Sequence, residues 1–397
     1  MKLKNIIKFI VIFILIMLIL IISYNIYENY KIKHAKILVE LNSELTIPYK
    51  SDVKVSDFIK SINGKYDDFK IDTSSLGVKE INLSYINDDS IKVSYKFNIE
   101  VKDVTPPFVM LSDNYSVYVN SPDTLIDDIL CGDDLTDEPK CIIEGYYDLN
   151  TIGSYPLSFI ATDNYNNKTV KKFNLLVKQK ENKKTYNNTY TDFNDVYKIH
   201  KTDKTKIGLD ISKYQGNIDF NKIKSLGVSF VMIRVGTRDI NNNFVLDPKF
   251  KQNIEGALSA SLDVGIYFYS YASNLEEARE DARWVIKNIE GYKITLPVAF
   301  DWEDFKSFNS YKVSFNKLTN IAYAYLDELK TNGYDAMLYG SKYYLEYIWQ
   351  NDKYDTWLAH YIDKTTYKGK YKMWQMCSNG KIDGIDGYVD IDILYEN

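Results

Sequence analysis

The chain has 397 residues, too many for one compact core, and its length predicts several domains. Its net charge is −5, and basic and acidic residues are mixed along the sequence. This balance provides no basic patch for nucleic-acid phosphates, so nucleic-acid binding is not expected.

An apolar run opens the chain. Phe9 to Ile22 contains no charged residue, and Lys2, Lys4 and Lys8 precede it. A helix of about 20 mostly apolar residues crosses the hydrocarbon core of a bilayer, and the lysines favour a cytoplasmic N-terminus. A cleaved signal peptide has the same pattern, but SYNIYENY after the run offers no small-x-small cleavage site. We therefore expect residues 1–30 to be a single-pass membrane anchor, with the remaining chain outside the cytoplasm.

Two segments, 36–103 and 104–178, repeat each other. DTSSLGVKEINLSY in the first parallels DLNTIGSYPLSFIA in the second, and KFNIEVK parallels KFNLLVK. Apolar and polar residues alternate in both copies between Gly, Asp and Asn turns, which predicts short antiparallel strands of a β-sandwich. Each repeat resembles the bacterial immunoglobulin-like modules that occur in tandem on cell-surface proteins. Neither carries a catalytic constellation, so a spacer is favoured over a specific binder.

The second repeat contains a small insertion around Cys131 and Cys141. These residues could form a disulfide in an oxidising compartment, and two separate thiols explain the sequence equally well. Cys377 has no obvious partner, and the three histidines are scattered, so neither a zinc site nor another cofactor is expected.

Residues 179–204 are polar and without sustained periodicity, which predicts a flexible linker. From residue 205 to 397, apolar strands alternate with amphipathic helices, and the gaps between the last strands are too short for full helices. This segment predicts an eight-stranded β/α barrel with five regular βα units followed by three strands.

Acidic residues recur where the strands of this barrel end. Asp210 ends the first strand, Asp301 and Glu303 follow the fourth, and Asp390 lies on the last. Chemistry in such barrels occurs at the C-terminal ends of the strands. Residues two apart on a strand point to the same side, and carboxyl groups in different environments are what glycosidic cleavage requires. Asp386 and Asp392 lie close to Asp390 and are alternatives to it.

Aromatic side chains near the same strand ends are candidates for a sugar-binding groove, because their faces fit the apolar faces of pyranose rings. Tyrosine is abundant throughout the chain, with 35 residues, so a packing role competes at each position. Tyr269 and Trp374 are the two that we expect to contact sugar, and Gln375 is expected to bond sugar hydroxyls or acetamides. The full set of aromatic candidates is Tyr267, Tyr269, Tyr271, Tyr339, Trp357, Tyr361 and Trp374.

GLDISKYQGNIDF, GIYFYSYA, LPVAFDWED, WLAHY, the Trp374–Gln375 pair and GIDGYVDID resemble, in that order, the lysozymes of glycoside hydrolase family 25. The resemblance implies an irregular β/α barrel and an N-acetylmuramidase. Such an enzyme cleaves the β-1,4 bond between N-acetylmuramic acid and N-acetylglucosamine in peptidoglycan. The chain departs from the family by lacking a histidine that many members carry near Tyr267–Ser270.

The same resemblance implies a role for each acid. Glu303 is the expected general acid, and Asp301 assists by orienting the substrate acetamide. Asp210 and Asp390 are expected to tune the electrostatics and hold the sugar before the scissile bond. Both direct displacement and participation of the substrate acetamide fit this pair of carboxylates.

Together these features predict a monomeric, membrane-anchored peptidoglycan hydrolase that remodels the wall outside the cell membrane. Two other interpretations remain. The barrel could bind wall glycan without cutting it, or the repeats could carry the main function as an adhesin or scaffold.

Overall fold

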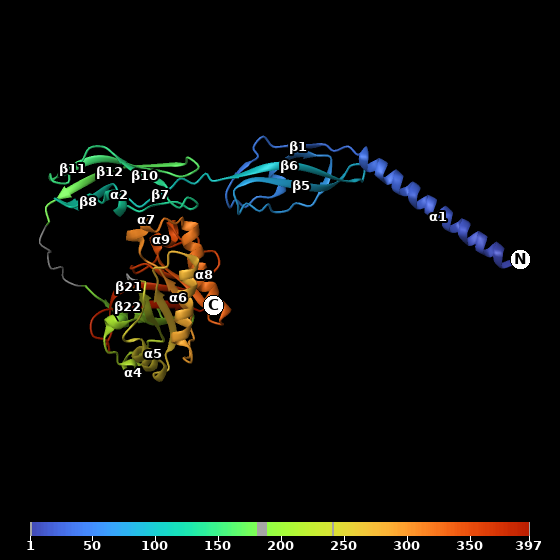
Figure 1. Cartoon of the computed structure of the whole chain (residues 1–397). Helices are drawn as coiled ribbons and strands as arrows, with labels where there is room; N and C mark the ends of the chain where they lie inside the picture. The colour runs from blue at the N-terminus through green and yellow to red at the C-terminus, as the bar shows by residue number, and fades with distance from the viewer. Residues whose placement is uncertain (1, 181–188, 240–241, 397) are drawn as a thin grey trace. The chain divides into compact units, whose positions relative to one another are not determined.

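The computed structural model describes residues 2–180, 189–239 and 242–396 of the chain (Figure 1). It divides into two compact units, Met1–Val104 and Thr105–Asn397. The first contains the N-terminal helix and the first repeat, and the second contains the second repeat and the barrel.

Helix α1 (Lys2–Lys33) contains the apolar run, and its part from Lys8 onward is long and apolar enough to cross a membrane. Large apolar side chains between Ile12 and Ile22 are about half exposed or more. A membrane span and a signal sequence both satisfy this test of length and composition.

The first repeat folds around one long hairpin, formed by β5 (Gly77–Asn87) and β6 (Lys92–Lys102). Buried side chains alternate with exposed ones along both strands, as a sheet with one covered face requires. The sheet has the order β2-β6-β5-β4, and β1 pairs with β3 in a second, two-stranded sheet. The remaining elements are β1 (Val39–Leu41), β2 (Thr46–Pro48), the 3-10 helix η1 (Val55–Phe58), β3 (Ile59–Ile62) and β4 (Gly64–Tyr66).

The second repeat has an equivalent arrangement, with the hairpin β11 (Gly153–Thr162) and β12 (Lys168–Lys178) in a sheet of order β10-β11-β12-β8. The internal repeat detected in the sequence is therefore also a repeat of strand order. Its other elements are β7 (Phe108–Val109), β8 (Asn114–Tyr118), α2 (Leu125–Asp128), β9 (Cys131–Gly132) and β10 (Lys140–Glu144). Cys131 and Cys141 form a disulfide.

One strand in each repeat differs from the antiparallel prediction. β2 runs parallel to β6, and β8 runs parallel to β12. The paired strands come from the beginning and the end of the repeat, so no tight hairpin forces them to be antiparallel.

The linker prediction is wrong for its C-terminal part. β13 (Thr191–Asp192) pairs with a barrel strand, and α3 (Phe193–His200) begins at the N-cap Asp192. Phe193 and Val196 are buried in the barrel's core cluster. Two apolar residues spaced three apart therefore attach this polar segment to the barrel. Residues 181–188 of the predicted linker lie outside the described residues.

Eight strands close the predicted barrel. The first seven strands are parallel in the order of the chain, and the last is antiparallel to both of its neighbours. The strands are β14 (Thr205–Ile211), β15 (Phe230–Arg238), β17 (Asp263–Tyr269), β18 (Val298–Asp301), β19 (Ala336–Ser341), β20 (Asp355–Ala359), β21 (Met373–Lys381) and β22 (Val389–Tyr395). A short strand, β16 (Phe244–Leu246), pairs with β15 outside the barrel.

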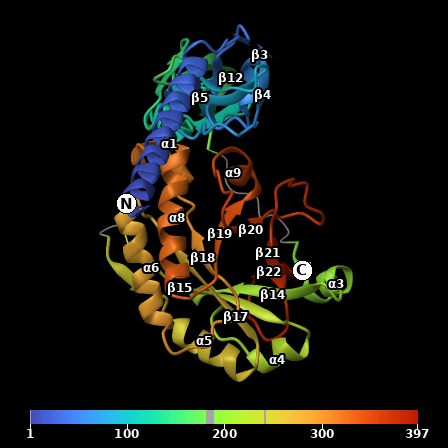
Figure 2. The ribbon, with the colours of Figure 1, turned by 90° about the vertical axis from the view of Figure 1, so that its right-hand side faces the viewer.

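Helices follow the first five barrel strands and are absent after the last three within the described residues, as the sequence predicts. α6 and α8 lie side by side along the outside of the strands (Figure 2). The helices are α4 (Phe220–Ser225), α5 (Phe250–Ser259), α6 (Leu275–Ile289), α8 (Phe315–Thr331) and α9 (Lys342–Tyr347). The 3-10 turns η2 (Lys213–Gln215) and η3 (Phe305–Ser307) and the short helix α7 (Phe308–Tyr311) lie in the loops.

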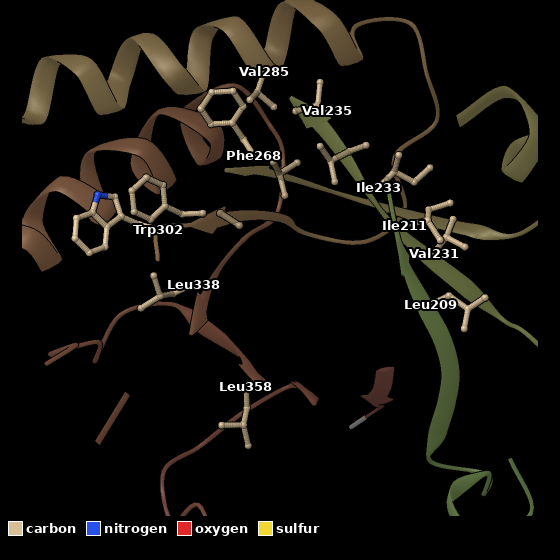
Figure 3. Close-up of a cluster of buried hydrophobic side chains, with 14 of the residues drawn as sticks. Leu209, Ile211, Val231, Ile233, Val235, Phe268, Val285, Trp302, Leu338 and Leu358 are labelled. Carbon is tan, nitrogen blue, oxygen red and sulfur yellow. The ribbon is translucent and has the colours of Figure 1, made fainter. Parts of the chain in front are cut away.

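The barrel has two apolar layers. Outward-facing strand residues such as Ile233 and Leu338 form the main core with helix residues such as Val285 (Figure 3). Inward-facing residues fill the barrel, among them Phe230, Met337 and Met373. These inward-facing side chains pack the barrel interior below the strands' C-terminal ends, where the polar residues of the candidate active site lie.

We expect Phe193→Ala to destabilise the barrel by about 3–5 kcal/mol, because it removes a fully buried ring from the contact between α3 and the strands. Tryptophan fluorescence during thermal unfolding measures this, since the five tryptophans all belong to the barrel: Trp284, Trp302, Trp349, Trp357 and Trp374. Ile199→Ala, on the same helix but 72% exposed, is the control and should melt like wild type. Equal midpoints for the two variants would show that α3 is not part of the barrel's folded core.

Candidate active site

The four predicted acids surround one cavity of about 240 Å³ at the C-terminal ends of the parallel strands. Asp210 is on β14, Asp301 ends β18, and Glu303 follows two residues later. Asp390 comes from the start of β22, which is at this end because β22 runs antiparallel to the others. The register of β14 and β22 places Asp390 directly beside Asp210.

Asp301 and Glu303 are held by their surroundings in different ways. Asp301 is 5% exposed, its backbone carbonyl accepts a hydrogen bond from Ser270 N at 2.7 Å, and its Oδ1 has no partner among the described residues. Trp302, between them, is fully buried on the opposite side, and its Nε1 donates to the carbonyl of Ala272 at 3.2 Å. Glu303 therefore lines the same cavity as Asp301 but is exposed at its rim.

Gln375 connects the polar groups of the cavity. Its Nε2 donates to Asp210 Oδ2 at 3.0 Å, and its Oε1 accepts from the hydroxyls of Tyr339 and Tyr361, each at 2.9 Å. Asp210 Oδ1 is buried and unpaired among the described residues. One oxygen of Asp210 is thus fixed by Gln375.

Each of these acids has a raised pKa, mainly because burial disfavours the charged form. Burial and then the neighbouring Asp390 raise the pKa of Asp210, and burial, Glu303 and Asp210 raise the pKa of Asp301. The pKa of Glu303 is raised by loss of solvation within the cavity. Burial, followed by the charge of Glu303, raises the pKa of Asp390 to about 7. The cluster can therefore hold protons near neutral pH, as a general acid must.

Aromatic residues form the floor and the walls. Trp357 is 1% exposed, its Nε1 donates to Asp392 Oδ1 at 2.8 Å, and the rings of Tyr267 and Tyr339 pack against it edge-on. Six of the eight aromatic and amide candidates line the cavity: Tyr267, Tyr269, Tyr339, Trp357, Tyr361 and Gln375. Tyr271 is exposed beside Tyr269 and does not line the cavity.

Trp374 is the second aromatic candidate that does not line the cavity. Its ring belongs to the outer core, its Nε1 donates to the carbonyl of His360 at 2.9 Å, and it packs edge-on against His200 of α3. Neighbouring strand residues point to opposite faces, so when Gln375 points into the barrel, Trp374 must point out of it.

One charged group at the cavity, Arg234, was not predicted, and the structure also distinguishes Asp390 from its alternative Asp392. Arg234 on β15 lines the cavity, lowers the pKa of Asp301 against the effect of burial, and is held by two hydrogen bonds of 3.0 and 2.7 Å to Asp247 Oδ2. Asp392 is fully buried under Asp210, so Asp390 rather than Asp392 lines the cavity. An arginine inside the apolar strand VSFVMIRV was the signal for Arg234, since charge in a buried strand requires a partner.

The cavity contains no histidine or cysteine among the described residues that line it, so its chemistry is that of carboxyl, hydroxyl, amide and guanidinium groups. A protonated carboxyl group can donate to a leaving oxygen, while ionised neighbours stabilise positive charge. Tyr361, which is exposed, and Tyr269, which is half-buried, both line the cavity.

Comparison with known proteins finds similar sequences over the barrel. The family model described as "Glycosyl hydrolases family 25" matches residues 209–385. The chain is 27% identical over 192 residues to the "Autolytic lysozyme" of Clostridium acetobutylicum, covering 48% of this chain and 56% of that protein. It is 22% identical over 193 residues to the Escherichia coli protein YegX, covering 47% of this chain and 68% of that one.

Among solved structures, a family 25 glycosyl hydrolase from Bacillus anthracis is 24% identical, with a TM-score of 0.41. The alignment covers 50% of this chain and 93% of the Bacillus anthracis chain. The chain spans just over half the length of the curated autolytic lysozyme that it matches.

We expect Asp390→Asn to make the barrel more stable at neutral and alkaline pH. The pKa of Asp390 is about 7 in the folded chain against an ordinary 3.8. Because its pKa is higher in the folded chain, Asp390 binds a proton more tightly there than in the unfolded chain. The resulting stabilisation is fully present below pH 3.8 and is lost as the pH rises through about 7. Asn stays neutral, so the variant should melt above wild type at about pH 8 and close to it at about pH 4.

Tryptophan fluorescence melts across this range measure the effect. Asp386→Asn, on the exposed turn before β22, is the matched control and should follow wild type throughout. If the melting midpoint of Asp390→Asn does not exceed that of wild type at alkaline pH, ionised Asp390 does not destabilise the folded chain.

Proposed function

Because residues 209–385 are a domain of glycosyl hydrolases family 25, we propose that the chain is a peptidoglycan hydrolase with lysozyme activity. The substrate bond is the β-1,4 linkage between N-acetylmuramic acid and N-acetylglucosamine. The observation that carries this proposal is the convergence of Asp210, Asp301, Glu303 and Asp390 on one cavity whose acids have raised pKa values.

Glu303 is the proposed general acid. It is the exposed member of the cluster, so a glycosidic oxygen can reach it, and its raised pKa favours the protonated form that donates. Its position two residues after Asp301, on the same side of the chain, supports donation into the cavity.

Asp301 is the proposed partner of the substrate acetamide. Its Oδ1 is buried and has no partner among the described residues, and Arg234 partly offsets the effect of burial on its pKa. An acetamide N–H bonded to this oxygen would place the acetamide carbonyl near the anomeric carbon, where it can stabilise the developing positive charge. Asp210 and Asp390, which lie side by side on β14 and β22, would hold the same sugar.

The rest of the chain suits an enzyme that stays near its own membrane. Helix α1 is proposed as a membrane anchor, supported by its length and apolar composition. The two repeats are proposed as immunoglobulin-like modules, supported by their shared strand order and long antiparallel hairpins. In this arrangement the barrel would act on the cell's own wall.

The bond cleaved is tested with purified full-length chain in detergent, incubated with peptidoglycan. Mass spectrometry should find N-acetylmuramic acid at the reducing ends of the products. N-acetylglucosamine at the reducing ends would make the bond assignment wrong. Binding without any products would instead support a glycan-binding barrel.

Glu303→Gln should lower hydrolysis by about two to four orders of magnitude, because the amide has no proton to donate to the leaving oxygen. Release of reducing ends from peptidoglycan is the measurement, and the fluorescence melt should stay near that of wild type. Glu290→Gln, exposed at the end of α6, is the matched control. Near-normal turnover in Glu303→Gln would remove Glu303 from the acid role.

Membrane anchoring predicts that the chain stays with the membrane fraction after extraction with alkaline carbonate, because an apolar helix of this length partitions into lipid. Immunoblotting of the pellet and the supernatant measures this. A chain released by carbonate and lacking its first residues would instead match a cleaved signal sequence.

A further inference from the structure

The loop that carries Glu303 is held by the second repeat. Residues 302–314 connect β18 to α8 and contain only η3 and the four-residue α7. Such short helices are not stable alone. Phe305 N donates to the carbonyl of Glu303 at 2.7 Å, so the backbone of the proposed acid is bonded to the first turn of this segment.

Asn309, in α7, connects the loop to the second repeat through four hydrogen bonds. Its Nδ2 lies within hydrogen-bond distance of three backbone carbonyls, those of Ile126, Asp127 and Ile129, at 3.2, 3.2 and 2.9 Å. Its Oδ1 accepts from the backbone N–H of Cys131 at 3.0 Å. A single amide side chain therefore joins the two segments at the start of the disulfide-closed loop.

The second repeat also caps the helix that follows. The first N–H groups of an α-helix have no partner within the helix. In α8 the N–H of Phe315 donates to the carbonyl of Asp133 at 2.8 Å, and the N–H of Asn316 donates to that of Asp134 at 3.2 Å. Asp137 accepts from Ser314 N at 3.1 Å and pairs with Lys317.

Apolar packing supports these polar contacts. Leu130 is 4% exposed and belongs to the barrel's core cluster. Phe108 stacks on Tyr347 at 5.1 Å. Gly132 lies so close to the barrel that a Cβ there would be 2.5 Å from the ring of Phe315. The repeat and the barrel thus share buried surface.

The contacting acids come from the segment that distinguishes the two repeats. Residues 133–139 separate β9 from β10, whereas Asn63 alone separates β3 from β4. Asp133, Asp134 and Asp137 lie in this insertion, and so does Glu138, which pairs with Lys312 at 2.9 Å. The Cys131–Cys141 disulfide closes it.

We propose that residues 126–138 of the second repeat are a positioning element for the catalytic loop, and that their docking through Asn309 sets the turnover rate of the barrel. This inference rests on the proposed hydrolase function. Asn309 is a positioning residue, because it acts on Glu303 through α7 and η3 and does not line the cavity.

The test uses the full-length chain with Asn309→Ala, and with Cys131→Ser/Cys141→Ser as a second way of loosening the docked loop. Hydrogen exchange at the amides of Phe315 and Asn316 reports docking, because their acceptors are in the second repeat. Asn288→Ala is the matched control, since within the described part of the chain its half-buried amide bonds its own helix alone, at Trp284 O. Kinetics on solubilised glycan strands are measured well below the unfolding midpoint.

Both test variants should exchange faster at these two amides and lose about tenfold in kcat, with little change in KM, because a catalytic group displaced by a fraction of an ångström loses rate more than binding. The alkaline limb of the kcat profile should shift, since it reports the acid in the complex. A role in stability alone would change only the melting midpoint. The control should match wild type in every measurement.

Faster exchange with unchanged kcat and an unchanged pH profile would overturn the inference, as would wild-type exchange in both variants. An inactive wild-type chain would instead contradict the proposed function itself. The two failures are therefore distinguishable.

Discussion

The antiparallel closure of the barrel by β22 is the constraint on which the site depends. A parallel last strand would place its first residues at the opposite end of the barrel from the other strands' C-terminal ends. Because β22 reverses direction between β21 and β14, Asp390 enters beside Asp210 at the mouth, and Asp392 lies one layer below. A single strand thus adds a rim acid and a buried acid to a site otherwise built from parallel strands.

Collecting this many acids in one cavity opposes folding. Asp210, Asp301 and Asp392 are nearly or fully buried, and each has one oxygen without a hydrogen-bond partner among the described residues. Uncompensated buried charge is strongly disfavoured, so these groups tend to keep their protons. The apolar filling below the site and the helix-covered core around it supply the stability that the acids remove. Protonation removes the unfavourable buried charge from the folded chain, and it also provides the proton that a general acid donates.

The sequence predicted the barrel and the positions of four acids at the ends of its strands, because strand ends and the D-x-E pair follow from local periodicity. It was wrong about Trp374, which was placed in the groove because it is aromatic. Side chains alternate along a strand, so Gln375 points inward and Trp374 points outward. α3 was missed because only Phe193 and Val196 are buried in an otherwise polar helix. The partners of Asn309 could not be predicted, since they are three backbone carbonyls and one backbone N–H about 180 residues earlier in the chain, and backbone groups carry no sequence signal.

The parallel pairing of β8 with β12, and of β2 with β6, has a mechanical consequence. If α1 is the membrane anchor proposed above and the barrel holds insoluble peptidoglycan, tension would pull on the two ends of each repeat. Parallel strands pulled from opposite ends resist through all their hydrogen bonds at once, in shear, whereas a hairpin pulled from its open end separates one bond at a time. Five residue pairs join β8 to β12 and three join β2 to β6. Under such tension both strand pairs would be loaded in shear, with more residue pairs in the second repeat than in the first.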